Sequence, residues 1–272
     1  MTTPVKKNIV ENMNLSDAYG QRFSGIARLY GEQALQTFSS SKVAIIGIGG
    51  VGSWTAEALA RSGVQNITLI DLDEVCITNT NRQLHALEKT VGVAKVQVVK
   101  ERLEQINPEG NFIAIEEFLT SDTLAELFAP GFDIVVDAID SLKNKALLAV
   151  HCRQNKIALV TVGGAGGKKD PTLIRKGDLS ESTQDNLLKR MKKKLRVDFD
   201  FPRTGPMDIT CIYSIERAVY PTDEGKTCFK KDLKDKSQAK LDCATGMGTA
   251  TFGTGSFGFT AAHCALELLL SK

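Results

Sequence analysis

The sequence predicts a doubly wound α/β fold with a mainly parallel sheet, and three observations lead to this prediction. From Lys42 onward, short apolar segments rich in Val and Ile alternate with segments of helical periodicity. Within the apolar segments polar residues do not alternate with apolar ones, which is typical of strands buried on both faces. A glycine-rich turn follows the first apolar segment. This alternation indicates a parallel sheet covered by helices on both sides.

The predicted elements follow one another closely in the first two thirds of the chain. Strands are expected at 42–48, 66–73, 111–117, 132–140 and 157–164, with helices at 53–63, 93–106, 121–128 and 141–155.

After Gly167 the pattern loosens, because four prolines and a lysine-rich stretch interrupt it. We place the edge of the core there and expect residues 168–245 to form an insertion with short strands or a mobile part that faces substrate. Residues 252–270 are apolar, but they include Gly, His and Glu. This favours a helix packed in the core over a membrane span, although contact of this segment with a membrane stays open.

The composition is that of a folded globular protein. Of 272 residues, 42% are hydrophobic and 24% are charged, and the formal net charge is +2. Any contact with nucleic acid must therefore use local basic patches. The six cysteines form no CxxC pair, and the N-terminus has no apolar run. We therefore expect no disulfide framework, no structural zinc and a cytoplasmic location.

The most informative segment is VAIIGIGGVGSW, which ends a predicted strand and begins a helix. Its glycines allow a tight turn and bring backbone N–H groups close to a phosphate, and they are Gly47, Gly49, Gly50 and Gly52. Asp71 ends the next strand about twenty residues later, where a ribose hydroxyl partner is expected. The sequence therefore predicts a nucleotide site, although a glycine turn without ligand has the same pattern.

The residues after Asp71 separate a triphosphate-cleaving enzyme from a dinucleotide oxidoreductase. The segment DEVCITNTNRQ supplies Asn79, Asn81 and Arg82, and Lys95 follows near the start of a helix. Cleavage of a triphosphate needs cations for the charge that develops on leaving pyrophosphate. Arg82 and Lys95 suit this catalytic role, while either one alone could be a solvated surface residue.

Asp140 follows the buried strand FDIVVDAID, at the sheet edge where open α/β folds bind ligands. We expect it to face Mg²⁺ and to act in catalysis. Asp137 points elsewhere, and one of the two carboxylates could instead cap the following helix.

Together, GIGGVGSW, LIDLDEVCITNTNRQ, GVAK and DAIDS resemble the ThiF/MoeB-type adenylating enzymes, relatives of ubiquitin-activating enzymes. Within that superfamily, RFSGIARLYG, CITNTNRQLHAL and TVGGAGGKKDPT resemble the branch of tRNA threonylcarbamoyladenosine dehydratases. The resemblance implies one ThiF-type domain, with residues 1–167 forming N-terminal helices and the ATP-binding core. Residues 168–272 would form a substrate-facing extension and a returning C-terminal helix.

The resemblance also implies an activity: ATP activates the carboxylate of threonylcarbamoyladenosine beside the tRNA anticodon, and the group then closes into a cyclic form with net loss of water. ATP and Mg²⁺ are the implied cofactors, and a monovalent cation stays open. By motif position the glycines contact phosphates, Asp71 binds the ribose, and the triphosphate is lined by Asp73, Asn79, Asn81, Arg82 and Lys95.

The implied partners are tRNA and a second copy of the chain. In the homodimer, an N-terminal arginine would contact the ATP of the partner copy, with Arg28 preferred over Arg22. A sulfur-relay protein, such as a cysteine desulfurase accessory protein, is a further candidate partner, and no DNA is expected. Cys243 lies near a cysteine of relatives, but ring closure by the substrate's own carbamoyl group needs no thiol.

Two lysine-rich clusters are candidates for tRNA phosphate contacts. The first places six basic residues among eight, namely Lys189, Arg190, Lys192, Lys193, Lys194 and Arg196. The second comprises Lys226, Lys230, Lys231, Lys234 and Lys236. A solvated basic face is the alternative interpretation of both.

Three other functions remain as alternatives. An activator of a sulfur-carrier protein is disfavoured by the lack of CxxC, and a nicotinamide-dependent reductase by Arg82 and Lys95. A nucleotide-binding scaffold would bind ATP without turnover. Among the histidines, His85 could approach the site, whereas His151 and His263 fall in predicted helices and are expected to pack there.

Overall fold

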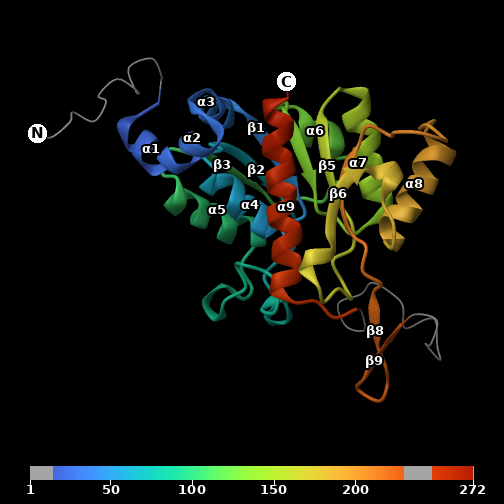
Figure 1. The fold of residues 1–272 in the computed structure, drawn as a ribbon. Helices are drawn as coiled ribbons and strands as arrows, with labels where there is room; N and C mark the ends of the chain where they lie inside the picture. The colour runs from blue at the N-terminus through green and yellow to red at the C-terminus, as the bar shows by residue number, and fades with distance from the viewer. Residues whose placement is uncertain (1–14, 230–246, 272) are drawn as a thin grey trace, which may run out of the picture.

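The computed structural model describes residues 15–229 and 247–271. Three short helices precede the sheet: α1 (Asp17–Arg22), α2 (Ser24–Tyr30) and α3 (Glu32–Ser40). Tyr19 of α1 is fully buried, and its hydroxyl donates a hydrogen bond to the Gly63 carbonyl. This contact fixes the N-terminal helices against the loop after α4 (Gly52–Arg61), at the end of the sheet from which β1 (Lys42–Ile46) starts (Figure 1).

Seven strands of the described chain form one twisted sheet in the order β3-β2-β1-β4-β5-β7-β6. All neighbours are parallel except β6 and β7. The strands are β1 (Lys42–Ile46), β2 (Asn66–Ile70), β3 (Asn111–Ile115), β4 (Ile134–Asp137), β5 (Ala158–Val162), β6 (Ile174–Asp178) and β7 (Thr210–Ser214). The predicted mainly parallel, doubly wound sheet is thus confirmed.

Helices cover both faces of this sheet, and the strands bury side chains toward each. The helices are α4 (Gly52–Arg61), α5 (Lys95–Ile106), α6 (Leu124–Phe128), α7 (Leu142–Gln154), α8 (Asn186–Asp198) and α9 (Thr251–Leu270). Along β1, Val43 and Ile45 join one core with α3, α4, α5 and α9, while Ala44 and Ile46 join a second core with α6, α7 and α8. Burial on both faces explains the non-alternating apolar strands.

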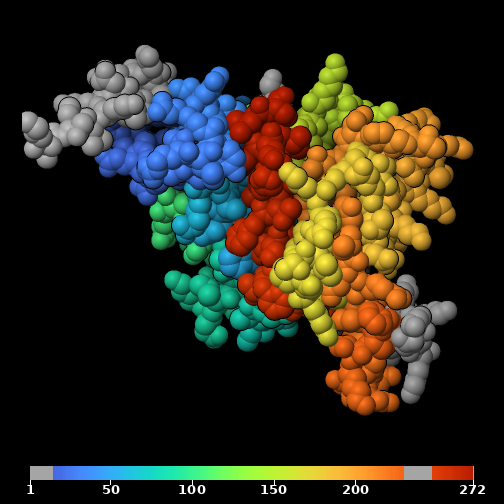
Figure 2. All heavy atoms as spheres, in the orientation of Figure 1, coloured from blue at the N-terminus to red at the C-terminus, as the bar shows by residue number. Residues whose placement is uncertain are grey.

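Helix α9 crosses the front of the sheet, in red in Figures 1 and 2. It packs closely on α4: a Cβ at Gly258 would lie 2.7 Å from the Val51 carbonyl oxygen. The prediction of a core helix at residues 252–270 is confirmed. None of the described helices combines the length and apolar character that a membrane crossing requires.

The sheet continues past Gly167, because β7 pairs with β5 in parallel and β6 pairs with β7. A small hairpin of β8 (Val219–Pro221) and β9 (Thr227–Phe229) projects beyond the body of the molecule (Figure 2). That residues 1–167 bind ATP and residues 168–272 face the substrate stays a prediction.

Candidate active site

A cavity of about 1070 Å³ lies at the carboxyl ends of the parallel strands. The strand order reverses between β1 and β4 there, which is where open α/β sheets bind ligands. The cavity brings together almost all the residues predicted from the sequence: Gly47, Gly49, Gly50, Asp71, Asp73, Asn79, Asn81, Arg82, Lys95 and Asp140.

The glycine loop connects β1 to α4 at one wall of the cavity. Gly47 has a φ of 89°, and a Cβ there would lie 2.8 Å from the Ala138 carbonyl oxygen, so the turn requires glycine. Gly52 does not line the cavity; a Cβ at this position would lie 1.8 Å from the Gly47 carbonyl oxygen. Gly52 therefore allows α4 to pack on the loop, which differs from the predicted phosphate contact.

The start of α4 borders the cavity. Its N-cap residue, Val51, forms no side-chain capping bond, and both Val51 and Gly50 line the cavity. Amides in the first turn of a helix have no partner within the helix and attract anions. This geometry suits a phosphate group.

Asp71 is held in place by the glycine loop. Its Oδ2 accepts a hydrogen bond of 2.6 Å from the Ile48 amide, and its Oδ1 accepts one of 2.8 Å from the Asp73 amide. Burial raises the pKa of Asp71 despite the nearby Lys95. Each oxygen keeps a second lone pair that can accept a bond from a ribose hydroxyl.

Lys95, the first residue of α5, reaches the cavity floor and pairs with Asp73 at 2.6 Å. Its side chain is only 7% exposed, whereas that of Asp73 is 57% exposed. The ion pair keeps the Lys95 ammonium beside the cavity. There, phosphates of a bound nucleotide could compete with the Asp73 carboxylate for the ammonium group.

Arg82 and Asn81 connect the cavity wall to the start of α9. The Arg82 guanidinium donates to the Thr78 carbonyl at 2.8 Å and to Asn81 Oδ1 at 3.0 Å. Asn81 Nδ2 donates to the Thr249 carbonyl at 2.9 Å, and the Arg82 carbonyl accepts from Trp54 Nε1 at 3.2 Å. Arg82 is thus oriented from two sides.

Asn79 is buried, and its Oδ1 accepts a bond of 3.0 Å from the Cys76 amide, which shapes this loop.

The two aspartates after β4 have different surroundings. Asp140 is exposed and lines the cavity. Asp137 is fully buried and forms an ion pair with Lys145 at 2.8 Å. The N-cap of α7 is Ser141, which has no side-chain capping bond. The expectation that one of these carboxylates caps the helix is therefore wrong, because Asp137 is engaged inside the core and Asp140 faces the cavity.

Asp140 is the residue of the cavity wall that could hold Mg²⁺ together with a bound nucleotide. No group of three or more His, Cys, Asp or Glu side chains that could hold a metal is found in residues 15–229 and 247–271. Mg²⁺ does not need such a group, since one or two carboxylates suffice where substrate phosphates and water supply the other ligands. Asp140 provides one such carboxylate at the cavity wall.

Two residues considered in the sequence analysis do not line the cavity of their own chain. Arg28 is exposed on α2 and does not line the cavity of its own chain. His85 is 2% exposed, and neither ring nitrogen has a partner. Burial, with a smaller contribution from Lys95, lowers the pKa of His85 to about 4. His85 is thus a neutral core residue beside the site and not part of its lining.

The cavity also has walls that sequence reasoning did not assign. They come from the segment after β5, from the start of α7 and from the residues before and within α9: Asn144, Gly163, Gly164, Ala165, Gly166, Met247, Gly248, Thr249 and Thr254. The only signals were the glycines of TVGGAGG and GMGTATFGTG. Folding brings both segments to the glycine loop.

The predicted tRNA-binding lysines of the first cluster lie on α8. Lys189, Arg190 and Lys193 are exposed. Lys192 instead donates to the Ser180 and Ser182 carbonyls at 3.2 and 2.7 Å, Lys194 pairs with Asp198, and Arg196 donates to the Pro202 carbonyl. Of the second cluster only Lys226 is described; Lys230, Lys231, Lys234 and Lys236, like Cys243, lie outside the described residues.

Comparison with known proteins gives a consistent classification. The fold and the cavity define a nucleotide-binding α/β protein, and the ThiF family matches residues 23–272. The chain belongs to this family.

Its similarity extends over almost the whole chain. It is 48% identical to tRNA threonylcarbamoyladenosine dehydratase of Escherichia coli (strain K12), covering 95% of this chain and 97% of that protein. It is 42% identical to the protein of the same name from Haemophilus influenzae, covering 94% and 96%. The structure of the E. coli enzyme TcdA in complex with ATP superposes with a TM-score of 0.83 at 46% identity, covering 94% of this chain and 96% of that chain.

Proposed function

We propose that this protein uses ATP to dehydrate threonylcarbamoyladenosine in tRNA, next to the anticodon, to its cyclic form. The observation that carries the proposal is the cavity, which gathers a glycine loop, Asp71, Arg82 and Lys95 in a chain similar over almost its whole length to dehydratases of this name. An activator of a sulfur-carrier protein is less well supported, because both of these relatives are named as tRNA dehydratases.

The reaction proceeds through an acyl adenylate. A carboxylate oxygen of the substrate attacks the α-phosphorus of ATP, and the bond to pyrophosphate breaks. The carbamoyl group then attacks the activated carbonyl carbon and loses a proton to solvent, and AMP leaves with the carboxylate oxygen. The sum is the loss of one water from the nucleoside and the conversion of ATP to AMP and pyrophosphate.

The chain's own residues supply the electrostatics of this sequence. The amides at the start of α4 bind phosphate oxygens, and Arg82 and Lys95 stabilise the negative charge that develops on pyrophosphate. Asp71 positions the ribose through its free lone pairs. Mg²⁺, held by Asp140 together with the phosphates, would neutralise further charge.

The functional unit is a homodimer in this proposal. Two aromatic side chains on α9, Phe252 and Phe259, are 56% and 50% exposed, and Phe259 packs edge-on against Trp54 at 5.8 Å; in this proposal both contact the second copy. Arg28 lies outside its own cavity, so a role toward ATP requires the second copy. Cross-linking of an Arg28→Cys variant to a nucleotide-site cysteine of the partner copy tests this arrangement.

The exposed face of α8 is the proposed contact for tRNA phosphates. Leu187, in the first turn of α8, lines the cavity, and Lys189, Arg190 and Lys193 follow it on the exposed side. A basic helix that starts at the cavity can hold the anticodon arm while the modified base enters.

The proposed location is the cytoplasm. A sulfur-relay protein remains a further proposed partner, tested by co-purification.

Mass spectrometry of nucleosides tests the function directly. tRNA bearing threonylcarbamoyladenosine is incubated with the protein, ATP and Mg²⁺, with Arg82→Ala as the control. We expect an ATP-dependent loss of one water from the modified adenosine that Arg82→Ala abolishes. An unchanged nucleoside, with ATP–pyrophosphate exchange appearing on addition of a carrier protein, would favour the sulfur-carrier activator instead.

A further inference from the structure

A fully buried ion pair lies directly behind the cavity wall. Lys145 of α7 and Asp137 of β4 are both 0% exposed, and Lys145 Nζ lies 2.8 Å from Asp137 Oδ2. Thr161 of β5 completes the cluster: its Oγ1 donates to Asp137 Oδ2 at 2.6 Å and accepts from Lys145 Nζ at 3.1 Å. Lys145 Nζ also donates to the Asp137 carbonyl at 3.3 Å. Three elements, β4, β5 and α7, are thus joined by one polar cluster.

Stability alone does not account for this cluster. Removing two charges from water is costly, and apolar residues of similar volume often serve a core equally well or better. The surrounding core is apolar, with Val135, Ala146 and Leu148 among its members. A buried charged cluster that satisfies its own hydrogen bonds does, however, fix one geometry.

The geometry that it fixes includes the backbone of the cavity wall. The second carboxylate oxygen, Asp137 Oδ1, accepts a hydrogen bond of 3.1 Å from the Ile139 amide. Ala138, Ile139 and Asp140 all line the cavity, and so does Asn144, the residue before Lys145. Ala138 also packs against the glycine loop so closely that a Cβ at Gly47 would be 2.8 Å from its carbonyl oxygen.

We propose that Asp137, Lys145 and Thr161 are positioning residues that hold the segment 138–140 against the glycine loop and thereby place the Asp140 carboxylate for adenylate formation. This inference rests on the proposed function, in which Asp140 acts toward the nucleotide. None of the three residues lines the cavity. Their effect on the reaction therefore passes through the backbone of residues 137–140.

A graded series at Thr161 tests the proposal without removing either charge. Thr161→Ser keeps the hydroxyl, Thr161→Cys replaces it with a weaker donor, and Thr161→Val removes it. We expect kcat for adenylate formation to fall in the order Ser, Cys, Val, with a loss on the order of tenfold for Val, the scale that a small misplacement of a catalytic group produces. KM for tRNA should stay within about twofold, because the α8 surface is untouched.

Two readouts separate positioning from general destabilisation. Hydrogen exchange of the peptide covering residues 138–140 should accelerate in the same order, Ser, Cys, Val. ATP affinity, followed through Trp54, the only tryptophan of the chain, reports whether the cavity still binds nucleotide. The control is Glu57→Gln, which weakens an ion cluster between the buried Glu57 and the partly exposed Arg61 and Arg102; none of the three lines the cavity. It should lower the melting temperature without changing kcat or the exchange of residues 138–140.

The possible negative results separate the positioning role of Thr161 from the role of Asp140 in the reaction. If kcat of Thr161→Val equals that of the unmodified protein, or if Glu57→Gln lowers kcat equally, the positioning role is wrong. Asp140→Asn serves as the reference variant. If Asp140→Asn leaves adenylate formation unchanged, the role proposed for Asp140 in the reaction is wrong, irrespective of the Thr161 series.

Discussion

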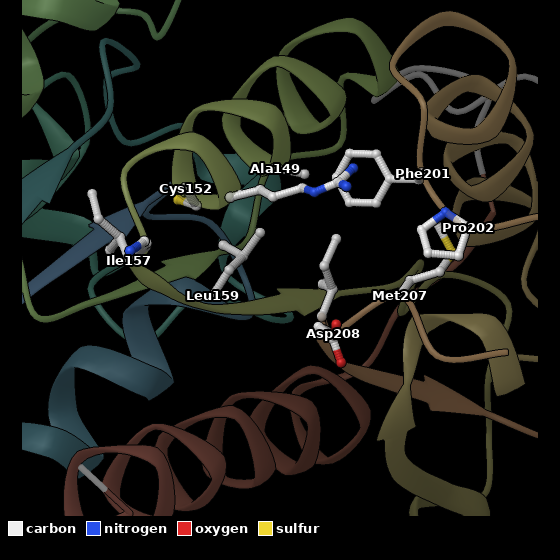
Figure 3. A pocket seen from close by; sticks show the side chains of 11 residues that line it. Ala149, Cys152, Ile157, Leu159, Phe201, Pro202, Met207 and Asp208 are labelled. Atoms are coloured by element: carbon white, nitrogen blue, oxygen red, sulfur yellow. The ribbon is translucent and has the colours of Figure 1, made fainter.

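Two hollows of the molecule differ in their chemistry. The large cavity at the carboxyl ends of the strands is bordered by charged side chains, glycine backbone and a helix start without a cap. A smaller hollow of about 240 Å³ lies between α7 and residues 201–209, and Figure 3 shows that it is lined mainly by Cys152, Leu159, Phe201 and Met207. Charged residues at its border are Arg153, Lys156 and Asp208, and Arg153 lies over the Phe201 ring at 4.3 Å and donates to the Asp200 carbonyl.

The comparison teaches that concavity alone does not mark a functional site. In the small hollow, the polar group of Arg153 is satisfied within the protein. The large cavity is lined by the uncapped start of α4 and by the exposed Asp140, together with Asp71, Arg82 and Lys95. Several polar groups that converge on one large cavity indicate ligand chemistry.

The largest expected effect comes from Arg82→Ala in the large cavity. Loss of the guanidinium should lower the rate of adenylate formation by about 100- to 1000-fold, because a donor to developing charge is removed. The thermal transition should shift little. ATP–pyrophosphate exchange and calorimetry measure the two quantities. An activity within threefold of the unmodified protein would remove Arg82 from the catalytic residues.

The small hollow should show the opposite pattern. Met207 is 3% exposed, and Met207→Ala should lower the free energy of unfolding by about 3 kcal/mol because it enlarges an apolar cavity. Activity at temperatures below the transition should be unchanged. Urea unfolding and dehydration assays measure this, and a selective loss of activity would assign a function to the small hollow.

The pH dependence of stability is expected to be smaller and to originate beside the large cavity. The folded-state pKa of His85 is about 4, against 6.5 when unfolded, so the unfolded state binds the proton more readily in this range. The contribution of neutral His85 to the free energy of unfolding is fully present above about pH 6.5 and is lost as the pH falls toward 4. The loss between pH 7.5 and pH 5 is about 2 kcal/mol.

A His85→Leu variant should lack this part of the pH dependence. Both ring nitrogens are without partners, so an apolar side chain can take the place of the imidazole. Urea unfolding at a series of pH values gives the comparison. Identical pH slopes for both proteins would contradict the prediction.

The smallest expected effect is on the surface of α8. Lys189→Gln with Lys193→Gln should raise KM for tRNA several-fold and reduce the salt dependence of binding by about one in logarithmic slope per lost phosphate contact. ATP affinity should not change. The charge-matched control is Lys42→Gln with Lys100→Gln, away from α8. Equal effects of both pairs would indicate a nonspecific charge effect.

Much of the fold could be predicted because its signals are local. Buried strands with helices between them, the glycine loop after β1 and Asp71 at the end of β2 each show their type within a few residues. The sequence also indicated which side chains would gather at the carboxyl edge, since parallel strands bring their ends together. Asp140, Arg82 and Lys95 were found in this way.

The tertiary structure alone decided which of these residues face the cavity. Asp137 and Asp140 are three positions apart and chemically alike, yet one is sealed against Lys145 and the other lines the cavity. Likewise Lys192 donates to backbone carbonyls while Lys189 stays exposed. Strand β7 pairs with β5 although 47 residues, 163–209, separate the two strands.

The sequence by itself determined the fold class, the glycine loop and the residue types of a nucleotide site. Only the tertiary structure decided the partners of Asp137, the closure of the cavity by residues 247–249 and the mode of packing of Gly52. The physical reason is range: propensity and periodicity act over a few residues, whereas burial and ion pairing depend on contacts between segments far apart in the chain.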